Sequence, residues 1–262
     1  MTRRPFLLRD QLVNPQTRQD AAGPDLRRPR VSAIVPAFNE EETLAEVLSV
    51  LKETPLVDEV LVVSDGSTDE TVAIARAMGA RTIHLRRNHG KGMALAIGAV
   101  HTSAPVLVFV DGDIMNLSEY LLGQLIDPVV SRQAAMCVGI RHRGWLVDFF
   151  HSRFGPLLSG IRCLDRRVFD ALPERYVEGF AVETALNYSC NRQGLKVEVT
   201  VLHELKHRVK ERKRGLLAGA RARLEMFGAV FSAWLRLHWD RPVLRPGNGG
   251  RTLQAGLDYV SW

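Results

Sequence analysis

Four short segments rich in apolar or β-branched residues constrain the fold of this chain more than any other feature. They occupy residues 31–35, 59–63, 81–85 and 106–110, and such runs between polar turns are typical of buried strands. Segments with helical spacing of their apolar residues separate them, at 39–51, 67–78 and 92–101. Strands that alternate with helices predict an α/β fold, in which helices flank a mostly parallel sheet.

The first two helices are preceded by a capping pattern. Asn39 and Ser67 are each followed three residues later by a glutamate, Glu42 and Glu70. A polar N-cap side chain together with a glutamate three residues on forms a capping box. We therefore expect Asn39 and Ser67 to cap these two helices.

The second half of the chain is less regular. Its apolar spacing predicts helices at 117–130 and 180–193 and strands at 134–140 and 195–202. A helical, amphipathic pattern runs from 213 to 239, and the Pro- and Gly-rich stretch 242–250 is expected to be irregular. We divide the chain into a flexible arm at 1–30, the α/β domain at 31–210, and a C-terminal helical extension with a tail at 211–262.

The composition suits one large domain with its own core. The chain has 262 residues, 46% hydrophobic and 24% charged. Its cysteines, Cys137, Cys163 and Cys190, include no CxxC pair, which argues against a disulfide framework and a zinc site. The sequence shows neither a secretory leader nor an apolar run of about 18 residues. These features predict a cytoplasmic protein without a membrane span.

The net charge of +6 is uneven, because basic residues gather at 1–30 and 203–223. Such runs are often solvated surface, but they also attract anions such as a diphosphate, an anionic lipid or nucleic acid. Neither segment has the interleaved aromatic residues that favour nucleic-acid binding. We therefore expect no nucleic-acid partner.

Polar residues follow several expected strands, at the edge where sheets of this kind bind ligands. Asp111 and Asp113 flank a glycine directly after the fourth strand. Two carboxylates on a tight turn can face one divalent cation, although Asp-Gly is also a common turn dipeptide. Asp65 follows the second strand, where it can accept hydrogen bonds from a ribose or a base edge. Lys91 stands between two glycines and offers a charge to phosphate.

Four segments, in this order and spacing, resemble the motifs of family-2-type glycosyltransferases. They are Val-Pro-Ala-Phe-Asn-Glu-Glu at 35–41, Val-Ser-Asp-Gly-Ser-Thr-Asp at 63–69, His-Gly-Lys-Gly at 89–92 and Phe-Val-Asp-Gly-Asp at 109–113. The resemblance implies the GT-A fold, a Rossmann-like sheet with a nucleotide-sugar site. It assigns Pro36, Ala37, Asn39 and Glu40 to the nucleobase pocket, Asp65 to base or ribose, Lys91 to the surroundings of the nucleotide, Asp111 to the ribose–diphosphate region and Asp113 to the metal.

The implied metal is Mg²⁺ or Mn²⁺, which would stabilise the departing nucleoside diphosphate. His207 is followed by arginine and fits the family's His-Arg pattern better than His203. The resemblance therefore implies that Asp113 and His207 both bind the metal.

Beyond residue 115 the chain resembles polyprenyl-phosphate sugar synthases and glucosyl-3-phosphoglycerate synthases. The resemblance implies that Gly160 and Arg162 bind the acceptor, although Arg162 could equally be a surface arginine. Glu183 would be a general base if the reaction inverts, or would only cap or solvate its helix. The catalytic residues are then Glu183 and Asp113, and retention stays open.

The expected reaction moves a sugar from a UDP- or GDP-sugar to a small phosphorylated acid such as 3-phosphoglycerate or to a lipid phosphate. One alternative is a nucleotidyltransferase on a related fold, which usually has a glycine-rich, arginine-containing first loop. Another is a non-catalytic nucleotide- or nucleic-acid-binding protein. The apolar stretch 224–239 could contact the inner membrane face peripherally, dock on the core or form a homodimer contact.

Overall fold

The computed structural model describes residues 28–141, 159–173, 176, 181–202, 206–207 and 259–262. The arm expected at 1–30 lies outside them up to residue 27. The helix expected at 213–239 and the tail at 242–250 lie outside them entirely.

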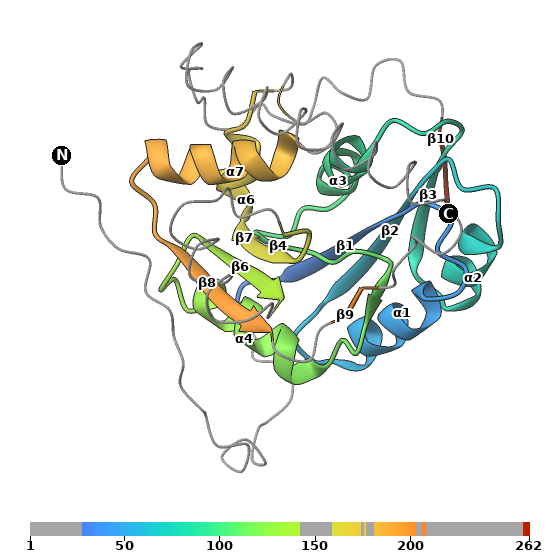
Figure 1. Ribbon diagram of the computed structural model, residues 1–262, viewed down its shortest axis with the longest axis horizontal. Coiled ribbons are helices and arrows are strands. Elements are labelled where there is room, and N and C mark those ends of the chain that lie inside the picture. The colour runs from blue at the N-terminus through green and yellow to red at the C-terminus, as the bar shows by residue number, and fades with distance from the viewer. Residues whose placement is uncertain (1–27, 142–158, 174–175, 177–180, 203–205, 208–258) are drawn as a thin grey trace, which may run out of the picture.

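An eight-stranded sheet forms the centre of the molecule, in the order β10-β3-β2-β1-β4-β7-β6-β8 (Figure 1). Its strands are β1 (Val31–Ala37), β2 (Glu59–Asp65), β3 (Arg81–Leu85), β4 (Val106–Phe109), β6 (Met136–Arg141), β7 (Arg162–Asp165), β8 (Val197–Leu202) and β10 (Tyr259–Ser261). The helices are α1 (Leu44–Glu53), α2 (Thr71–Ala77), α3 (Lys91–Val100), α4 (Glu119–Val130), α6 (Arg166–Asp170) and α7 (Ala181–Arg192). A separate two-stranded sheet joins β5 (Ile114–Met115) to β9 (Lys206–His207).

The main sheet is mixed but mostly parallel, which confirms the expected fold class. β1 runs parallel to β2 and β4, β2 to β3, and β6 to β8. β7 runs antiparallel to both β4 and β6. The sequence pattern did not predict β7, because Arg162 and Asp165 leave only two apolar residues between them.

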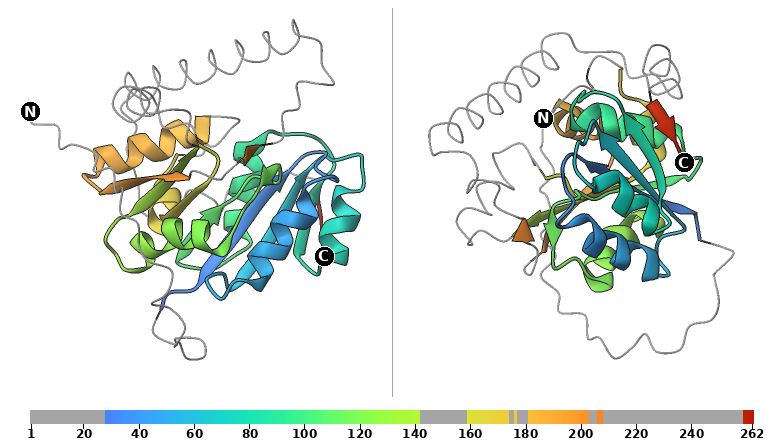
Figure 2. Two further views of the ribbon diagram at one scale, coloured as in Figure 1. Left: turned by 60° about the horizontal axis from the view of Figure 1, so that its bottom comes forward. Right: turned by 90° about the vertical axis from the view of Figure 1, so that its right-hand side faces the viewer.

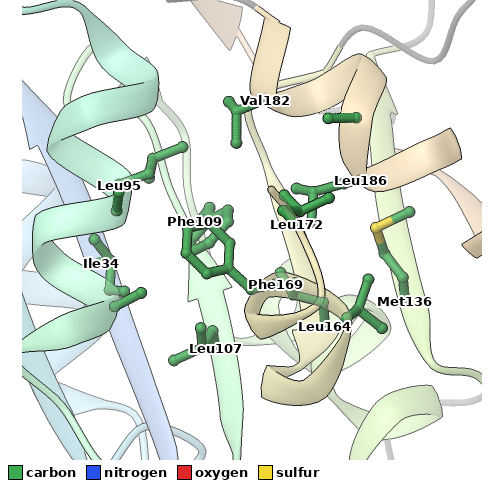
Figure 3. Packing of buried hydrophobic residues seen from close by; sticks show 14 of the residues in the cluster. Ile34, Leu95, Leu107, Phe109, Met136, Leu164, Phe169, Leu172, Val182 and Leu186 are labelled. Carbon is green, nitrogen blue, oxygen red and sulfur yellow. The ribbon is translucent and has the colours of Figure 1, made fainter. Parts of the chain in front are cut away.

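Helices cover both faces of the sheet, so the central strands are buried on two sides (Figure 2). On one face α3, α6 and α7 pack over alternate residues of the strands, and on the other face α1, α2 and α4 cover the remaining ones. Figure 3 shows the first of these layers, where Phe109 lies between Leu95 of α3 and Phe169 of α6. The rings of Phe109 and Phe169 meet edge to face at 5.8 Å. This burial explains why the strands read as continuous apolar runs.

The two expected capping boxes are wrong. α1 begins after Thr43 and α2 after Glu70, and neither helix has a side-chain cap. Asn39 instead adopts a positive φ of 55°, and its side-chain oxygen accepts a hydrogen bond from Thr68 N at 2.9 Å. The hydroxyl of Ser67 accepts from Asn39 N at 3.1 Å. Both side chains therefore join the loop after β1 to the loop after β2, and this contact between loops takes the place of helix capping.

The end of the chain adds a strand that no sequence pattern predicted. β10 pairs antiparallel with β3, and Trp262 and Thr82 exchange backbone hydrogen bonds of 2.8 and 3.0 Å. The Arg76 guanidinium lies 4.6 Å from the centre of the Trp262 ring. These last residues thus belong to the sheet of the α/β domain rather than to a separate C-terminal part. Within the described ranges, no helix is both long and apolar enough to cross a bilayer.

Candidate active site

The loops that follow β1, β2 and β4 lie together at the carboxyl edge of the sheet. The parallel register sets Ala37 of β1 beside Ser64 of β2, and Ile34 beside Phe109 of β4. The motifs at 36–40, 65–69 and 111–113 each follow or end one of these strands. Adjacent parallel strands therefore bring three separate motifs to one edge, as expected for a ligand site in an open α/β sheet.

The loop expected to face the nucleobase is held by hydrogen bonds that its backbone donates to side chains of the neighbouring segment at 69–71. Glu40 N donates to Thr71 Oγ1 at 2.8 Å, and Glu41 N donates to the Asp69 carboxylate at 3.2 Å. Among the predicted pocket residues, Pro36, Ala37 and Glu40 are buried and Asn39 is exposed. Phe38, which the sequence analysis did not single out, has 39% of its surface exposed beside them. Exposure cannot be read from the sequence, so the sequence held no signal that would single out Phe38 as a residue beside the pocket.

Asp65 holds the next loop in place. Its carboxylate oxygens accept from His89 N at 2.7 Å and Gly90 N at 2.8 Å, and the residue is only 3% exposed. Gly66 has a φ of 76°, and a Cβ there would lie 2.7 Å from the carbonyl carbon of Arg87. Only glycine allows this close approach. The structure thus favours a role for Asp65 in holding the loop before Lys91 over direct contact with a base or ribose.

Lys91, at the start of α3, joins two carboxylates from distant parts of the chain. Its ammonium nitrogen lies 2.7 Å from Asp111 Oδ1 and 3.0 Å from Glu183 Oε1. Burial alone would lower the pKa of Lys91, but the two carboxylates outweigh burial and raise it above its ordinary value. Lys91 is therefore a permanent cation, and its side chain remains 20% exposed.

Gly160 lies directly against this ion pair. A Cβ at Gly160 would lie 1.8 Å from Asp111 Oδ2 and 2.3 Å from Lys91 Nζ. The loop of Asp111 is held from its other side, where the Thr43 hydroxyl donates to the Gly112 carbonyl at 2.8 Å. The backbone at Gly160 therefore lies so close to the Lys91–Asp111 pair that a side chain at position 160 would displace these two groups.

Glu183 lies between two cations in the first turn of α7. Oε1 contacts Lys91, and Oε2 lies 3.9 Å from Nη2 of Arg162. Burial alone would raise the pKa of Glu183, but the Lys91 ammonium and the Arg162 guanidinium hold it below its ordinary value. Arg162 itself is 1% exposed. The structure therefore favours an internal role for Arg162 over the direct acceptor contact expected from the sequence.

The residues expected to bind metal are brought together by the small sheet. Asp113 lies half-buried in the turn between β4 and β5. The next residue, Ile114, is paired with His207 of β9, so the backbone of His207 lies beside the Asp-Gly-Asp turn. In the part of the chain that the structure describes, no cluster of three or more His, Cys, Asp or Glu could hold an ion. Two protein ligands still fit Mg²⁺ or Mn²⁺ when phosphate oxygens and water complete the coordination.

Comparison with known proteins places this chain in a family. Residues 32–174, more than half of the chain, match the family model described as Glycosyl transferase family 2. The chain is 34% identical over 132 residues to a glucosyl-3-phosphoglycerate synthase of Mycolicibacterium smegmatis, a match that covers 47% of this chain and 41% of that protein. It is 33% identical over 109 residues to a 4,4'-diaponeurosporenoate glycosyltransferase of Staphylococcus haemolyticus, covering 39% of this chain and 29% of that one. These matches therefore span less than half the length of either relative.

A solved structure supports the same grouping over more of the chain. The glucosyl-3-phosphoglycerate synthase of Mycobacterium tuberculosis, in complex with Mn²⁺, UDP and glucosyl-3-phosphoglycerate, superposes with a TM-score of 0.65 at 27% identity. The match covers 79% of each chain. The GT-A fold expected from the motifs is thereby confirmed, and this chain belongs to glycosyl transferase family 2.

Proposed function

We propose that this protein is a metal-dependent glycosyltransferase that moves a sugar from a UDP- or GDP-sugar to a small phosphorylated acid or to a lipid phosphate. The observation that carries the proposal is the grouping at one sheet edge of Asp111, Asp113, Lys91 and the backbone of His207. These groups come from the turn that follows β4, from α3 and from β9. Two carboxylates and one cation at a strand end are the groups that a metal–diphosphate complex requires.

The donor would lie across the loops at this edge. Pro36, Ala37, Asn39 and Glu40 would surround the base, and Asp65 would fix the loop that presents Lys91. Asp113 and His207 would hold Mg²⁺ or Mn²⁺, which neutralises charge on the departing diphosphate when it is bound. Lys91 adds a fixed positive charge near the same phosphates, and its partner Asp111 would turn toward the ribose side.

The proposed class of acceptor is based on what the proteins similar to this chain bind or act on. Structures of the Mycobacterium tuberculosis synthase include one with Mn²⁺, UDP-glucose and phosphoglyceric acid, and another relative, from Sodalis glossinidius, is an undecaprenyl-phosphate 4-deoxy-4-formamido-L-arabinose transferase. We favour a small phosphorylated acid, because the sequence match to a glucosyl-3-phosphoglycerate synthase covers 47% of the chain and the sequence match to the arabinose transferase covers 34%. The acceptor would approach the sugar from the partly exposed side of Lys91 and Asp111, beside Gly160.

Product formation tests this proposal. The purified protein is incubated with Mn²⁺, with UDP-glucose or GDP-mannose, and with 3-phosphoglycerate or a short polyprenyl phosphate, and products are identified by mass spectrometry. We expect a hexosyl adduct of one acceptor and release of UDP or GDP. Asp113→Asn should abolish the adduct, whereas Glu53→Gln, at an exposed position of α1, should leave it unchanged. Equal turnover of wild type and Asp113→Asn would refute the metal assignment. Formation of a nucleotide-sugar from UTP and a sugar phosphate instead would identify a nucleotidyltransferase.

A further inference from the structure

Arg162 is a charged side chain in the interior of the protein. It is 1% exposed and is the largest fully buried side chain among the described residues. Its strand, β7, is an inner strand of the sheet and lies between β4 and β6. Burying a guanidinium group is costly unless its donors are satisfied and its charge is balanced. The groups around Arg162 therefore indicate why an arginine occupies this position.

The guanidinium nitrogens of Arg162 point to two segments that border the active site. Nε and Nη2 donate to the Ser159 carbonyl oxygen at 3.1 and 2.7 Å. Nη1 donates to the backbone carbonyl of Glu183 at 3.4 Å, and Nη2 lies 3.9 Å from the Glu183 carboxylate. One side chain thus holds both the segment that leads into Gly160 and the first turn of α7.

Both of these segments act on Lys91. Glu183 accepts a hydrogen bond from Lys91 Nζ at 3.0 Å. The backbone at Gly160 bounds the same nitrogen so closely that a Cβ would lie 2.3 Å from it. Lys91 continues to Asp111 at 2.7 Å, so charges alternate along the row Arg162, Glu183, Lys91 and Asp111. A cation on a long flexible side chain is thereby confined by contacts that begin at Arg162.

We propose that Arg162 is a positioning residue, which sets the place of the Lys91 ammonium group through the Glu183 carboxylate and through the backbone at Gly160. The inference rests on the proposed function, in which Lys91 faces the donor diphosphate. Glu183 is then an ionised anchor for two cations rather than a proton acceptor. If Glu183 took up a proton, both Lys91 and Arg162 would lose a charge partner in a poorly solvated place.

A double-mutant cycle on nucleotide affinity tests this chain of contacts without the need for an acceptor. Calorimetry measures binding of UDP, or of GDP if the wild type prefers it, in the presence of Mn²⁺. We expect Lys91→Met and Arg162→Met each to weaken binding about tenfold or more, the effect of losing a charge-assisted hydrogen bond. In the Lys91→Met background, Arg162→Met should add less than about twofold, because its effect passes through Lys91. Losses that multiply in the double variant would overturn the proposal.

A matched control separates positioning from general damage to the core. Leu164 is on the same strand and fully buried, but its apolar side chain belongs to the hydrophobic cluster. Leu164→Ala should lower stability by about 2–5 kcal/mol and leave nucleotide affinity within about twofold. An equal loss of affinity in Leu164→Ala would overturn the proposal.

Two further variants cover the case in which Arg162→Met does not fold. Arg162→Lys keeps the charge but cannot hold Ser159 and Glu183 together, and Glu183→Gln keeps the acceptor but removes the charge. Both should weaken nucleotide binding only while Lys91 is present; weakening of equal size without Lys91 would contradict the inference. A wild type that binds neither UDP nor GDP with Mn²⁺ would refute the proposed function and this inference with it. Normal wild-type binding with multiplying losses would refute the role of Arg162 alone.

Discussion

Replacing Gly160 with alanine should disable the enzyme while leaving its fold nearly intact. The added Cβ would lie 1.8 Å from Asp111 Oδ2 and 2.3 Å from Lys91 Nζ, whereas a Cβ in a real protein keeps other atoms at 3.0 Å or more. The Asp111 carboxylate and the Lys91 ammonium group must therefore both move away from the added Cβ by a large fraction of an ångström or more. Both are about one-fifth exposed and can shift toward solvent, so the stability cost should stay at the low end of about 1–3 kcal/mol for overpacking.

The effect on activity should be much larger than the effect on stability. A misplacement of about 1 Å in a reacting site costs about 100-fold in rate, so Gly160→Ala should lose at least this much in kcat/KM for the nucleotide-sugar. Gly194→Ala is the matched control, because Gly194 has a φ of 64° but no atoms within 4 Å of an added Cβ. It should cost stability through backbone strain and leave turnover normal. Measured turnover of Gly160→Ala within about twofold of wild type would refute the reading that Gly160 bounds the reacting groups.

Three further predictions concern other parts of the described structure. Thr43→Val removes the hydroxyl that donates to the Gly112 carbonyl, so the affinity for Mn²⁺ in the presence of UDP, measured by paramagnetic resonance, should fall several-fold. Thr43→Ser should retain the wild-type affinity. Unchanged affinity in Thr43→Val would exclude a role for this contact. Burial raises the pKa of Cys137 and of Cys190 to about 12 and that of Cys163 well above its ordinary value. A disulfide reagent at pH 8 should therefore label these thiols only after urea unfolds the protein. Rapid labelling of two or more thiols in the native state would contradict their burial. Because the pKa of Glu183 is depressed in the folded state, its stabilising contribution is present above the unfolded-state pKa near 4.5 and is lost as pH falls through the lower folded value. Between pH 7 and pH 3, the free energy of unfolding measured in urea should therefore fall less steeply in Glu183→Gln than in wild type. Identical slopes would show that Glu183 is not ion-paired.

The fold could be predicted from the sequence wherever the composition of a single segment was enough to identify a strand. The strands β1, β2 and β4 contain runs of apolar residues because helices cover both faces of the sheet, so their positions follow from local composition. β7 could not be predicted in this way, because Arg162 looks like a surface residue until Glu183 and Ser159 are seen beside it. β10 is short and its pairing depends on β3, far away in the chain.

The candidate site was also predictable only in part: its location follows from the sequence, but the contacts of its side chains do not. Strand order alone explains why the motifs after β1, β2 and β4 meet at one edge. How each side chain is used depends on partners from other loops: Asp65 accepts from His89 and Gly90, and Asn39 accepts from Thr68 instead of capping a helix. Such contacts join segments more than 20 residues apart, and no local pattern encodes them.

Metal-dependent binding of the nucleotide would show whether Asp113 holds a metal ion against the diphosphate. Wild type and Asp113→Asn are titrated with UDP and with GDP by calorimetry, with Mn²⁺ and with EDTA in its place. We expect wild type to bind one of the two nucleotides much more tightly with Mn²⁺, and Asp113→Asn to lose this gain while melting at nearly the same temperature. Binding that is equally strong without the ion, or unchanged by Asp113→Asn, would contradict this expectation.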